Sequence, residues 1–365
     1  MRLLLFSDLH LDTTFAWAPV EVGRQRRANI RETLRNIIQL ADEVNAEAIC
    51  SAGDLYEHEH FTPETARFLE QAFNDAGRLV LLAPGNHDPL LPGSIYATAG
   101  WSDNVHVIDT RRLEPAFRED GFTLWAAAHH VTAGTPGFLD GFTVEGGGVH
   151  YALFHGSAEH ALAREGDRKQ AHAPFTVAQI ERAGLHHALV GHYHTPDFGP
   201  LHTYPGNPDP LTFGEQGERG AVVVDVADDG TPVRVHHDVA VSKVHDLVVD
   251  VTGASTGDEV TEQARAVLEG HTGQVRLTLE GDLAEDVDLA ITDLRRLTTP
   301  DLFVLPRIGR IGAAYDLDAL ETEPTVRGEF VRSVRADPEL DDELRRRILT
   351  TGLRALEGRA DLEVL

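Results

Sequence analysis

Short apolar runs in the first hundred residues alternate with longer segments that repeat apolar residues at helical spacing. The runs 2–6, 48–52 and 79–83 have the length of buried strands, and each leads into a cluster of polar residues. Residues 24–44 and 63–76 place apolar side chains three and four positions apart, which predicts two helices. Strands that alternate with helices indicate an α/β fold, in which functional loops gather at the carboxyl ends of the strands.

From residue 122 onward the apolar segments have the pattern of antiparallel strands joined by hairpins. A turn signal, Asp228-Asp229-Gly230, separates the last two of them. The predicted strands are 122–127, 149–154, 188–190, 221–226 and 233–237.

The chain has 365 residues, more than one compact core usually holds, so more than one domain is expected. We predict a main domain at 1–241, a small α/β domain at 242–306 and a helical region at 307–365. In the small domain, a strand at 247–251, a helix at 258–269 and a strand at 274–279 precede a helix near 286–294. After residue 306 the pattern becomes helical.

The net charge of −27 excludes a protein that coats nucleic acid through a broad basic surface. DNA as a substrate would therefore be held locally, by metals and a few arginines, or by a partner. The single cysteine, Cys50, excludes an internal disulfide and a thiolate metal cluster. Neither a signal peptide nor a membrane span is evident, so we expect a soluble cytoplasmic protein without a membrane partner.

Five polar clusters follow the predicted strands, and each offers oxygen or imidazole donors. Alone, each is a weak signal, because a single histidine after a strand is more often structural than a ligand. Together they supply enough donors for two metal ions. The clusters are Asp8-Leu-His10, Gly53-Asp54, Gly85-Asn-His-Asp88, His155-Gly156 and Gly191-His-Tyr-His194.

Phosphodiester hydrolysis explains these residue types. The substrate is anionic, so its charge must be neutralised and a water molecule deprotonated near neutral pH, and two cations about 3.5–4 Å apart do both. Ions held so close need a bridging carboxylate, for which Asp54 is the candidate. Imidazole, carboxylate and amide donors without thiolate favour manganese, with iron or zinc as alternatives. Asn86 adds an oxygen without charge, so the site stays positive toward phosphate.

Taken together, the five clusters resemble the signature of the calcineurin-like metallophosphoesterases. The resemblance implies an α/β sandwich of two mixed β-sheets flanked by helices, with a small C-terminal α/β and helical region. It implies that His87 donates a proton or hydrogen bond to the leaving oxygen, while Asp88 either orients His87 or has only a structural role. The implied ligands are Asp8, His10, Asp54 and His194 for one ion, and Asp54, Asn86, His155 and His192 for the other.

Over residues 1–240 the chain is also similar to the SbcD-type branch of this superfamily, and within it to YhaO-like proteins. The similarity lies in Asp8-Leu-His-Leu-Asp12, Tyr204-Pro-Gly-Asn207 and the stretch from Phe213 to Gly220. It implies a DNA repair exonuclease that works with an SbcC-type ATPase and forms a homodimer. The chain departs from the branch at Glu57, where some of these nucleases carry a histidine that contacts substrate phosphate.

Two other functions fit the same residues. A phosphoesterase for a small phosphodiester or phosphomonoester would have the same metal centre, and the charge of −27 favours it. A non-catalytic scaffold for the ATPase would need neither the full ligand set nor His87, so those residues count against it.

Three further segments have two interpretations each. The arginines within 24–35 either track DNA or form a surface face paired with acids. The apolar faces of 326–334 and 340–356 either fill a core or dock the ATPase. Four polar residues after His155 either form a phosphate-binding lid or, the favoured interpretation, are solvated charge. They are His160, Arg164, Arg168 and Lys169.

Overall fold

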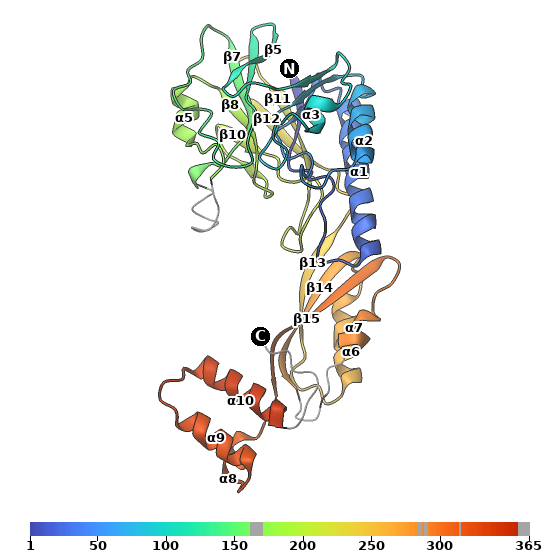
Figure 1. The fold of residues 1–365 in the computed structure, drawn as a ribbon, viewed down its shortest axis with the longest axis vertical. Helices are drawn as coiled ribbons and strands as arrows, with labels where there is room; N and C mark the ends of the chain where they lie inside the picture. Colours follow the sequence, from blue (N-terminus) through green and yellow to red (C-terminus); the bar gives the residue numbers. More distant parts are fainter. Residues whose placement is uncertain (161–170, 284–286, 288–290, 314, 357–365) are drawn as a thin grey trace. The chain divides into compact units, whose positions relative to one another are not determined.

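The structure is a computed structural model that describes residues 1–160, 171–283, 287, 291–313 and 315–356. The chain divides into two compact units, Met1–Ser242 and Lys243–Leu365. Figure 1 traces both units from the N-terminus to the C-terminus. Among the described residues, none of the helices has both the length and the apolarity that a membrane span requires.

The first unit contains two six-stranded sheets. The first sheet has the order β12-β11-β1-β2-β3-β4, and the second has the order β5-β6-β7-β8-β10-β9. The strands of the first sheet are β1 (Arg2–Phe6), β2 (Ala48–Ser51), β3 (Leu79–Leu82), β4 (Val105–Val107), β11 (Gly220–Val226) and β12 (Pro232–Asp238). Those of the second sheet are β5 (Glu114–Glu119), β6 (Phe122–Ala126), β7 (Val149–His155), β8 (His187–Gly191), β9 (Asp197–Phe198) and β10 (His202–Tyr204).

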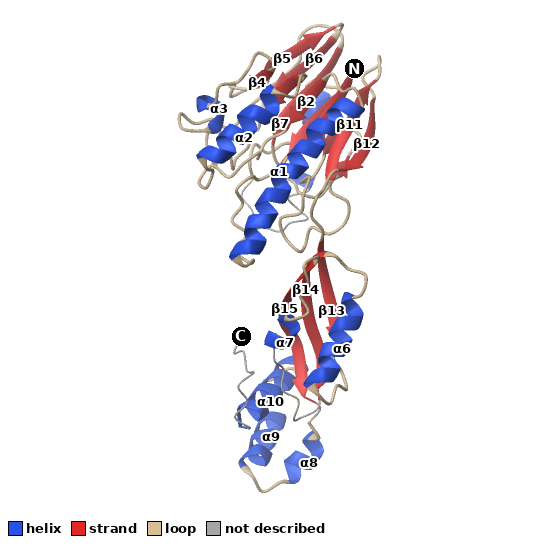
Figure 2. Ribbon diagram, turned by 90° about the vertical axis from the view of Figure 1, so that its right-hand side faces the viewer, coloured by secondary structure: helices blue, strands red, loops and turns tan. Residues whose placement is uncertain are grey.

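Helices cover the outer face of each sheet. Figure 2 shows α1 (Val20–Glu43) and α2 (Pro63–Asn74) side by side on the first sheet. A shorter helix, α3 (Ile95–Thr98), follows β3, and α5 (Val177–Arg182) packs on the second sheet. Apolar side chains also pack between the two sheets, and this layer includes residues of β1, β2, β6 and β7. The predicted sandwich of two mixed sheets flanked by helices is confirmed.

The apolar stripe of α1 anchors that helix to the first sheet. Ile30, Leu34 and Ile37 recur at helical spacing and are fully buried, each contributing about 1.5–3 kcal/mol through removal from water. The start of α2 is set by its sequence, since the Thr62 side chain accepts a hydrogen bond from the backbone N–H of Thr65 and Pro63 occupies the first turn.

The prediction of antiparallel strands after residue 122 is wrong for the centre of the second sheet. β6 pairs with β7 in parallel, and β7 pairs with β8 in parallel. The connecting segments 127–148 and 156–186 are too long for hairpins, and parallel pairing requires such long crossovers. The predicted hairpin of β11 and β12 is confirmed, with antiparallel register from Gly220↔Asp238 to Val226↔Pro232.

The second unit contains a parallel three-stranded sheet and helices. Helices α6 (Gly257–Leu268) and α7 (Ile291–Arg295) pack against its apolar face, and α8 (Leu317–Thr322), α9 (Val326–Ala336) and α10 (Asp342–Leu356) form a separate small core. The strands are β13 (Val244–Asp250), β14 (Gly273–Leu283) and β15 (Leu302–Ala313), in that order. The boundary predicted at 306–307 falls inside β15, because the strand continues beyond Pro306. Part of the helix predicted near 286–294 lies outside the described residues.

Candidate metal centre

Strands of both sheets end around one place, where the polar clusters of the sequence meet. Asp8, Asp54 and Asn86 follow β1, β2 and β3, which run parallel and side by side. His155 ends β7, and His192 follows β8, its parallel neighbour. Because neighbouring parallel strands present their carboxyl ends at the same edge of a sheet, residues far apart in sequence become neighbours.

One cluster contains Asp54, His155 and His192, whose candidate ligand atoms all lie within 4.8 Å of one another. Nε2 of His155 lies 3.2 Å from Oδ2 of Asp54. Asn86 lines the same cavity as Asp54 and His192. Burial, aided by the charge of His155, lowers the pKa of His192 to about 2, so its ring is in the neutral form that binds metals.

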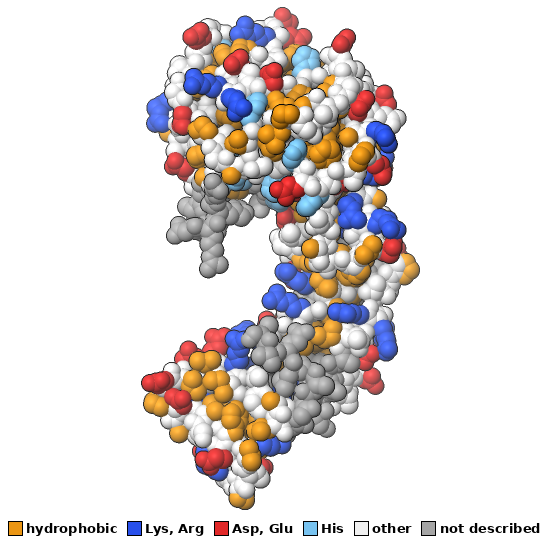
Figure 3. Space-filling view, in the orientation of Figure 1, with side chains coloured by type: hydrophobic (Ala, Val, Ile, Leu, Met, Phe, Trp, Pro, Cys, Tyr) orange, Lys and Arg blue, Asp and Glu red, His pale blue; other side chains and the backbone are white. Residues whose placement is uncertain are grey.

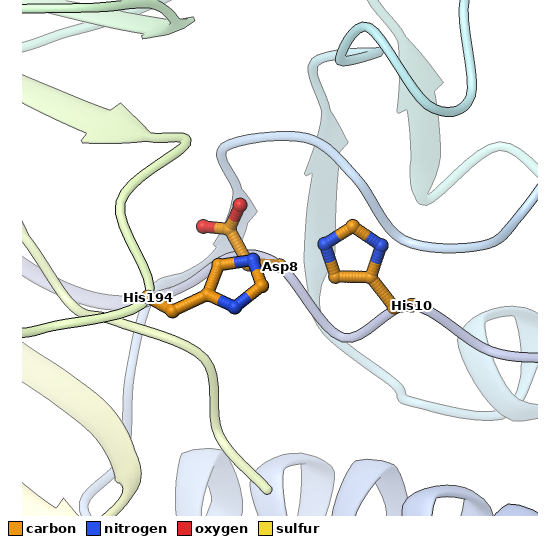
Figure 4. Close-up of side chains that lie close together, drawn as sticks. All are labelled: Asp8, His10 and His194. Carbon is orange, nitrogen blue, oxygen red and sulfur yellow. The ribbon is translucent and has the colours of Figure 1, made fainter. Parts of the chain in front are cut away.

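The second cluster contains Asp8, His10 and His194, again with candidate ligand atoms within 4.8 Å of one another. Figure 4 shows that these three side chains come from two segments: Asp8 and His10 from the loop after β1, and His194 from the loop after β8. Asp8 also ties the loops together, because its Oδ2 accepts a hydrogen bond of 3.0 Å from the backbone N–H of His192.

Asp54 lies between the two clusters. Its Oδ2 is 3.2 Å from Nε2 of His155 in one cluster and 3.9 Å from Nε2 of His10 in the other. Burial acts to raise the pKa of Asp54, but the interactions with His155 and His10 outweigh it, so the pKa lies well below its usual value and the carboxylate is ionised. This is the position and the charge that a bridging ligand requires.

Four donor atoms at these clusters are buried without a hydrogen-bond partner among the described residues. An unsatisfied buried polar atom costs about 1–3 kcal/mol, and such atoms are rare in folded proteins. Here all four belong to residues that the sequence predicts as ligands, and their chemistry suits divalent metals. The residues therefore fit two bound ions. The atoms are Oδ1 of Asp8, Nε2 of His10, Oδ1 of Asn86 and Nε2 of His155.

Four of the candidate ligands have a strained backbone. The φ angles are 55° at Asp8, 50° at His10, 52° at Asp54 and 121° at His192. A positive φ is uncommon for residues other than glycine, although Asp and His adopt it more readily than most, and it costs about 1–3 kcal/mol. Such strain persists where the surrounding structure enforces it, which is typical of functional sites.

Two glycines of the sequence clusters allow close packing around Asp54. A Cβ atom on Gly85 would lie 2.2 Å from Oδ1 of Asp54, and one on Gly191 would lie 2.2 Å from the backbone oxygen of Ala52. Neither approach leaves room for a side chain. These glycines let the loops after β2, β3 and β8 come together.

His87 lies beside the second cluster, with its ring 4.8 Å from that of His10. Glu57 contacts both rings: its Oε1 is 2.7 Å from Nδ1 of His10, and its Oε2 is 2.9 Å from Nδ1 of His87. The hydrogen bond with Glu57 raises the pKa of His87 to about 9, so the ring carries a proton at neutral pH. The sequence did not assign Glu57 this position; it only marked a departure from the SbcD-type pattern.

Asp88 makes its hydrogen bonds to the loops and to a tyrosine. Its carboxylate accepts from the backbone N–H groups of Asp54 (3.1 Å), Leu55 (2.6 Å) and Gly85 (2.7 Å) and from the hydroxyl of Tyr96 (2.6 Å). In the structure the carboxylate that contacts the His87 ring is that of Glu57. Asp88 fixes the loop that carries Asp54.

The motif from Phe213 to Gly220 supports the His194 loop. Oε1 of Glu215 lies 2.8 Å from Nδ1 of His194, and Oε2 accepts a 2.6 Å hydrogen bond from Asn207. The Arg219 guanidinium donates to Asn207 at 2.7 Å and also to the backbone oxygen of His194. The resemblance to the SbcD-type branch singled out these residues, but not their contact with a candidate ligand.

An open cavity of about 490 Å³ adjoins both clusters. Its lining includes His87, Asp54 and Asn86 of the metal centre as well as Phe15, Trp17 and Leu211. His172 also lines it, with its ring 5.5 Å from that of His192. Sequence reasoning missed His172, because no predicted strand precedes it. Arg164, Arg168 and Lys169 of the predicted lid lie outside the described residues.

The arginines at the start of α1 are mostly engaged within the protein. Arg26 is fully buried and contacts Asp209 at 3.0 Å, so it cannot track a DNA backbone. Arg24, Arg31 and Arg35 pair with Glu21, Glu64 and Glu32. Of the two interpretations, these contacts favour the paired surface face.

Comparison with known proteins gives a family match over most of the first unit. The model of the calcineurin-like phosphoesterase family matches residues 1–196. The fold is similar to TT1561 of Thermus thermophilus at 15% identity and a TM-score of 0.39, covering 64% of this chain and 98% of that one. It is also similar to a dimetal phosphatase from Danio rerio at 11% identity and a TM-score of 0.35, covering 61% and 92% of the two chains.

No curated protein sequence matches the chain. The family model, however, spans more than half of the chain, and the buried His and Asp clusters lie within the residues it matches. The protein is therefore a metal-dependent phosphoesterase of the calcineurin-like family.

Proposed function

We propose that this protein is a two-metal phosphodiesterase that acts as an exonuclease on DNA. The observation that carries the two-metal assignment is the set of unsatisfied buried donors on both sides of Asp54. The DNA assignment is supported by the motifs shared with the SbcD-type branch and by the composition of the cavity beside the site.

The residues divide the work of hydrolysis. Bound at the two clusters, divalent ions would neutralise the phosphate charge and make a water molecule more acidic. Manganese suits the donors best, with iron or zinc as alternatives. Asp8, His10 and His194 would hold one ion, Asn86, His155 and His192 the other, and Asp54 would contact both.

His87 supplies the proton in this mechanism. Its Nδ1 contacts Glu57, so Nε2 is the nitrogen that can donate to the leaving oxygen of the substrate. Glu57 keeps the ring protonated, because its hydrogen bond raises the pKa of His87 to about 9. Since Glu57 also contacts His10, one carboxylate positions both a candidate ligand and the proton donor.

The aromatic part of the cavity lining fits a nucleobase. Trp17 is half-buried there, with its ring 4.6 Å from that of Phe213 and 6.0 Å from that of Phe15. Its indole N–H is directed to the backbone oxygen of Leu211 at 3.4 Å, which fixes the ring. Bases stack on such aromatic side chains regardless of sequence, each contributing about 1–3 kcal/mol. A nucleotide could thus place its phosphate at the ions and its base against Trp17.

A manganese-supplemented assay tests the proposal, with linear duplex DNA and bis-p-nitrophenyl phosphate as substrates. We expect both to be hydrolysed. Trp17→Ala should weaken DNA binding by about 1–3 kcal/mol and leave the small substrate unaffected. Trp101→Ala is the matched control, because Trp101 is also half-buried and also donates to a backbone oxygen, but lies away from this cavity. Equal losses on both substrates in Trp17→Ala would contradict base stacking.

A small phosphoester remains the second candidate substrate, favoured by the net charge of −27. On the face shown in Figure 3, basic and acidic side chains are interspersed and form no continuous basic surface. Hydrolysis of bis-p-nitrophenyl phosphate without any action on DNA would establish this alternative. A manganese-loaded protein inactive on both substrates would instead favour a non-catalytic scaffold.

An SbcC-type ATPase is the partner we propose for the C-terminal helices. Val331, Leu349 and Leu353 are buried in the small core of α8–α10, whereas Val326 and Leu344 are 73% and 44% exposed. The exposed apolar residues are the candidate contact. Deletion of 320–365 should abolish ATPase binding and spare hydrolysis of the small substrate; retained binding would refute the assignment. Sedimentation analysis of the full chain tests the proposed homodimer.

A further inference from the structure

A third group of metal-ligating side chains lies outside the residues assigned above. His160 follows β7, Asp197 begins β9 and His202 begins β10. Their candidate ligand atoms all lie within 4.8 Å of one another. Oδ2 of Asp197 is 3.1 Å from Nε2 of His160 and 3.4 Å from Nε2 of His202, and the two rings are 5.2 Å apart. One carboxylate oxygen therefore stands between two imidazole nitrogens.

His202 is buried, and its Nε2 faces the carboxylate of Asp197. It is 3% exposed, and neither Nδ1 nor Nε2 makes a hydrogen bond to a described residue. Because buried polar atoms are normally satisfied, an imidazole in this state points to a missing ligand.

The backbone holds these groups in place. β9 and β10 pair in antiparallel register with Tyr204 opposite Asp197, so His202 lies diagonally from Asp197 on the same face of the sheet. Gly199, between the strands, leaves space for the imidazole, because a Cβ atom there would lie 2.1 Å from Cε1 of His202. The ring position is therefore built into the turn.

We propose that His160, Asp197 and His202 bind one divalent cation of the zinc type. Two imidazoles and a carboxylate are a common donor set for Zn²⁺, whose fourth position is then taken by water. Water can reach the site, since the side chains of His160 and Asp197 are 37% and 34% exposed while that of His202 is 4% exposed. The ion would satisfy the buried nitrogen of His202 that faces Asp197.

Such an ion would join the segments that carry the ligands of the metal centre. His160 lies five positions after His155, and Asp197 three after His194. Tyr204 of β10, the strand of His202, already links to the first of these segments: its hydroxyl donates to the backbone oxygen of Gly156 at 2.7 Å and accepts from the N–H of Ala158 at 3.0 Å. The ion would therefore reinforce an existing link between β10 and the segment after β7.

The test counts zinc in the full chain with the main centre disabled. The Asp54→Asn variant is loaded with zinc and dialysed, and we expect it to retain zinc. Adding His160→Ala or Asp197→Asn should lower the zinc content by one equivalent per chain. His160 is exposed, so its replacement should leave the fold intact. His106→Ala, at an exposed histidine of β4, is the matched control and should lose none.

A second readout uses cobalt in place of zinc. In the same Asp54→Asn background, the visible absorption of bound Co²⁺ should fall on His160→Ala and stay constant on His106→Ala. Two results would overturn the proposal: zinc content unchanged by both His160→Ala and Asp197→Asn, or an equal loss in the His106→Ala control. Neither depends on catalytic activity, so failure of the proposed nuclease function would leave the outcome readable.

Discussion

The two clusters of the metal centre contain similar donors but differ in the groups that contact Nδ1 of their histidines. In the cluster of Asp8, the rings of His10 and His194 each contact a carboxylate through Nδ1, from Glu57 at 2.7 Å and Glu215 at 2.8 Å. In the cluster of His192, the hydrogen-bond partner of Nδ1 of His155 within the described part of the chain is the backbone oxygen of Ala52, at 2.9 Å.

This difference predicts which of the two positions binds its ion more tightly. A carboxylate behind an imidazole fixes the ring and makes it a stronger donor, whereas a backbone carbonyl fixes the ring with less effect on its basicity. We therefore expect the position at Asp8, His10 and His194 to keep its ion at lower free-metal concentrations. Asp54, which faces both positions, should matter equally to each.

Asp54→Asn should have the largest effect, because it removes the charge that both positions share. We expect loss of both ions by elemental analysis and of hydrolytic activity down to background. Asp103→Asn, at an exposed residue of the same unit, should bind and act as the wild type does. If Asp54→Asn retains two ions, Asp54 does not bridge them and does not matter equally to both clusters.

His87→Ala separates chemistry from ion binding. Loss of the proton donor should lower kcat about 10²–10⁴-fold, while both ions remain bound. Steady-state kinetics with elemental analysis of the same sample measures both quantities. His60→Ala, on the exposed loop after β2, is the control. If His87→Ala loses an ion, His87 belongs to a cluster and not beside it.

Glu215→Gln tests the comparison directly. Removing the carboxylate behind His194 should weaken one ion about 10–100-fold and leave the other nearly unchanged, as seen in a metal titration by calorimetry. Glu218→Gln, on the same loop but exposed, is the matched control. Equal weakening of both ions would show that the two clusters do not bind independently.

Glu57→Gln should weaken the same ion as Glu215→Gln does, because Glu57 contacts His10. Its distinct and smaller effect is a shift in pH dependence. His87 carries its proton below a pKa of about 9 and loses it as the pH rises through that value. Without the Glu57 charge the pKa falls, so the alkaline limb of the kcat profile should move to lower pH. Glu59→Gln, an exposed neighbour, should leave the limb in place. An unmoved limb in Glu57→Gln would mean that another group gives up the proton.

The seven candidate ligands could be predicted from sequence because each stands in a recognisable cluster after an apolar strand. The structure brings them together at the strand ends. Glu57 and Glu215 could not be assigned in the same way, since their partners His10 and His194 lie 47 and 21 positions away. Side chains that act through another residue leave no periodic signal; their contacts exist only once the loops are folded.

Strand direction was the other limit. β6, β7 and β8 have the composition of strands, and the sequence located them, but composition does not say which neighbour a strand pairs with or in which direction. Similarly, β15 was not predicted: the sequence indicated a helical pattern after residue 306, whereas the strand continues to Ala313. Pairing along β14, from Gly273 to Leu283, explains that continuation.

The positive φ angles at Asp8, His10, Asp54 and His192 restrict how this site can change. Aspartate and histidine tolerate that backbone, whereas β-branched residues such as valine or isoleucine resist it. Replacing a ligand by a bulky apolar residue would thus disturb the course of the chain as well as the chemistry. At these positions one residue determines both metal affinity and loop shape. Substitutions that abolish catalysis but keep the loops are therefore easiest to asparagine or glycine.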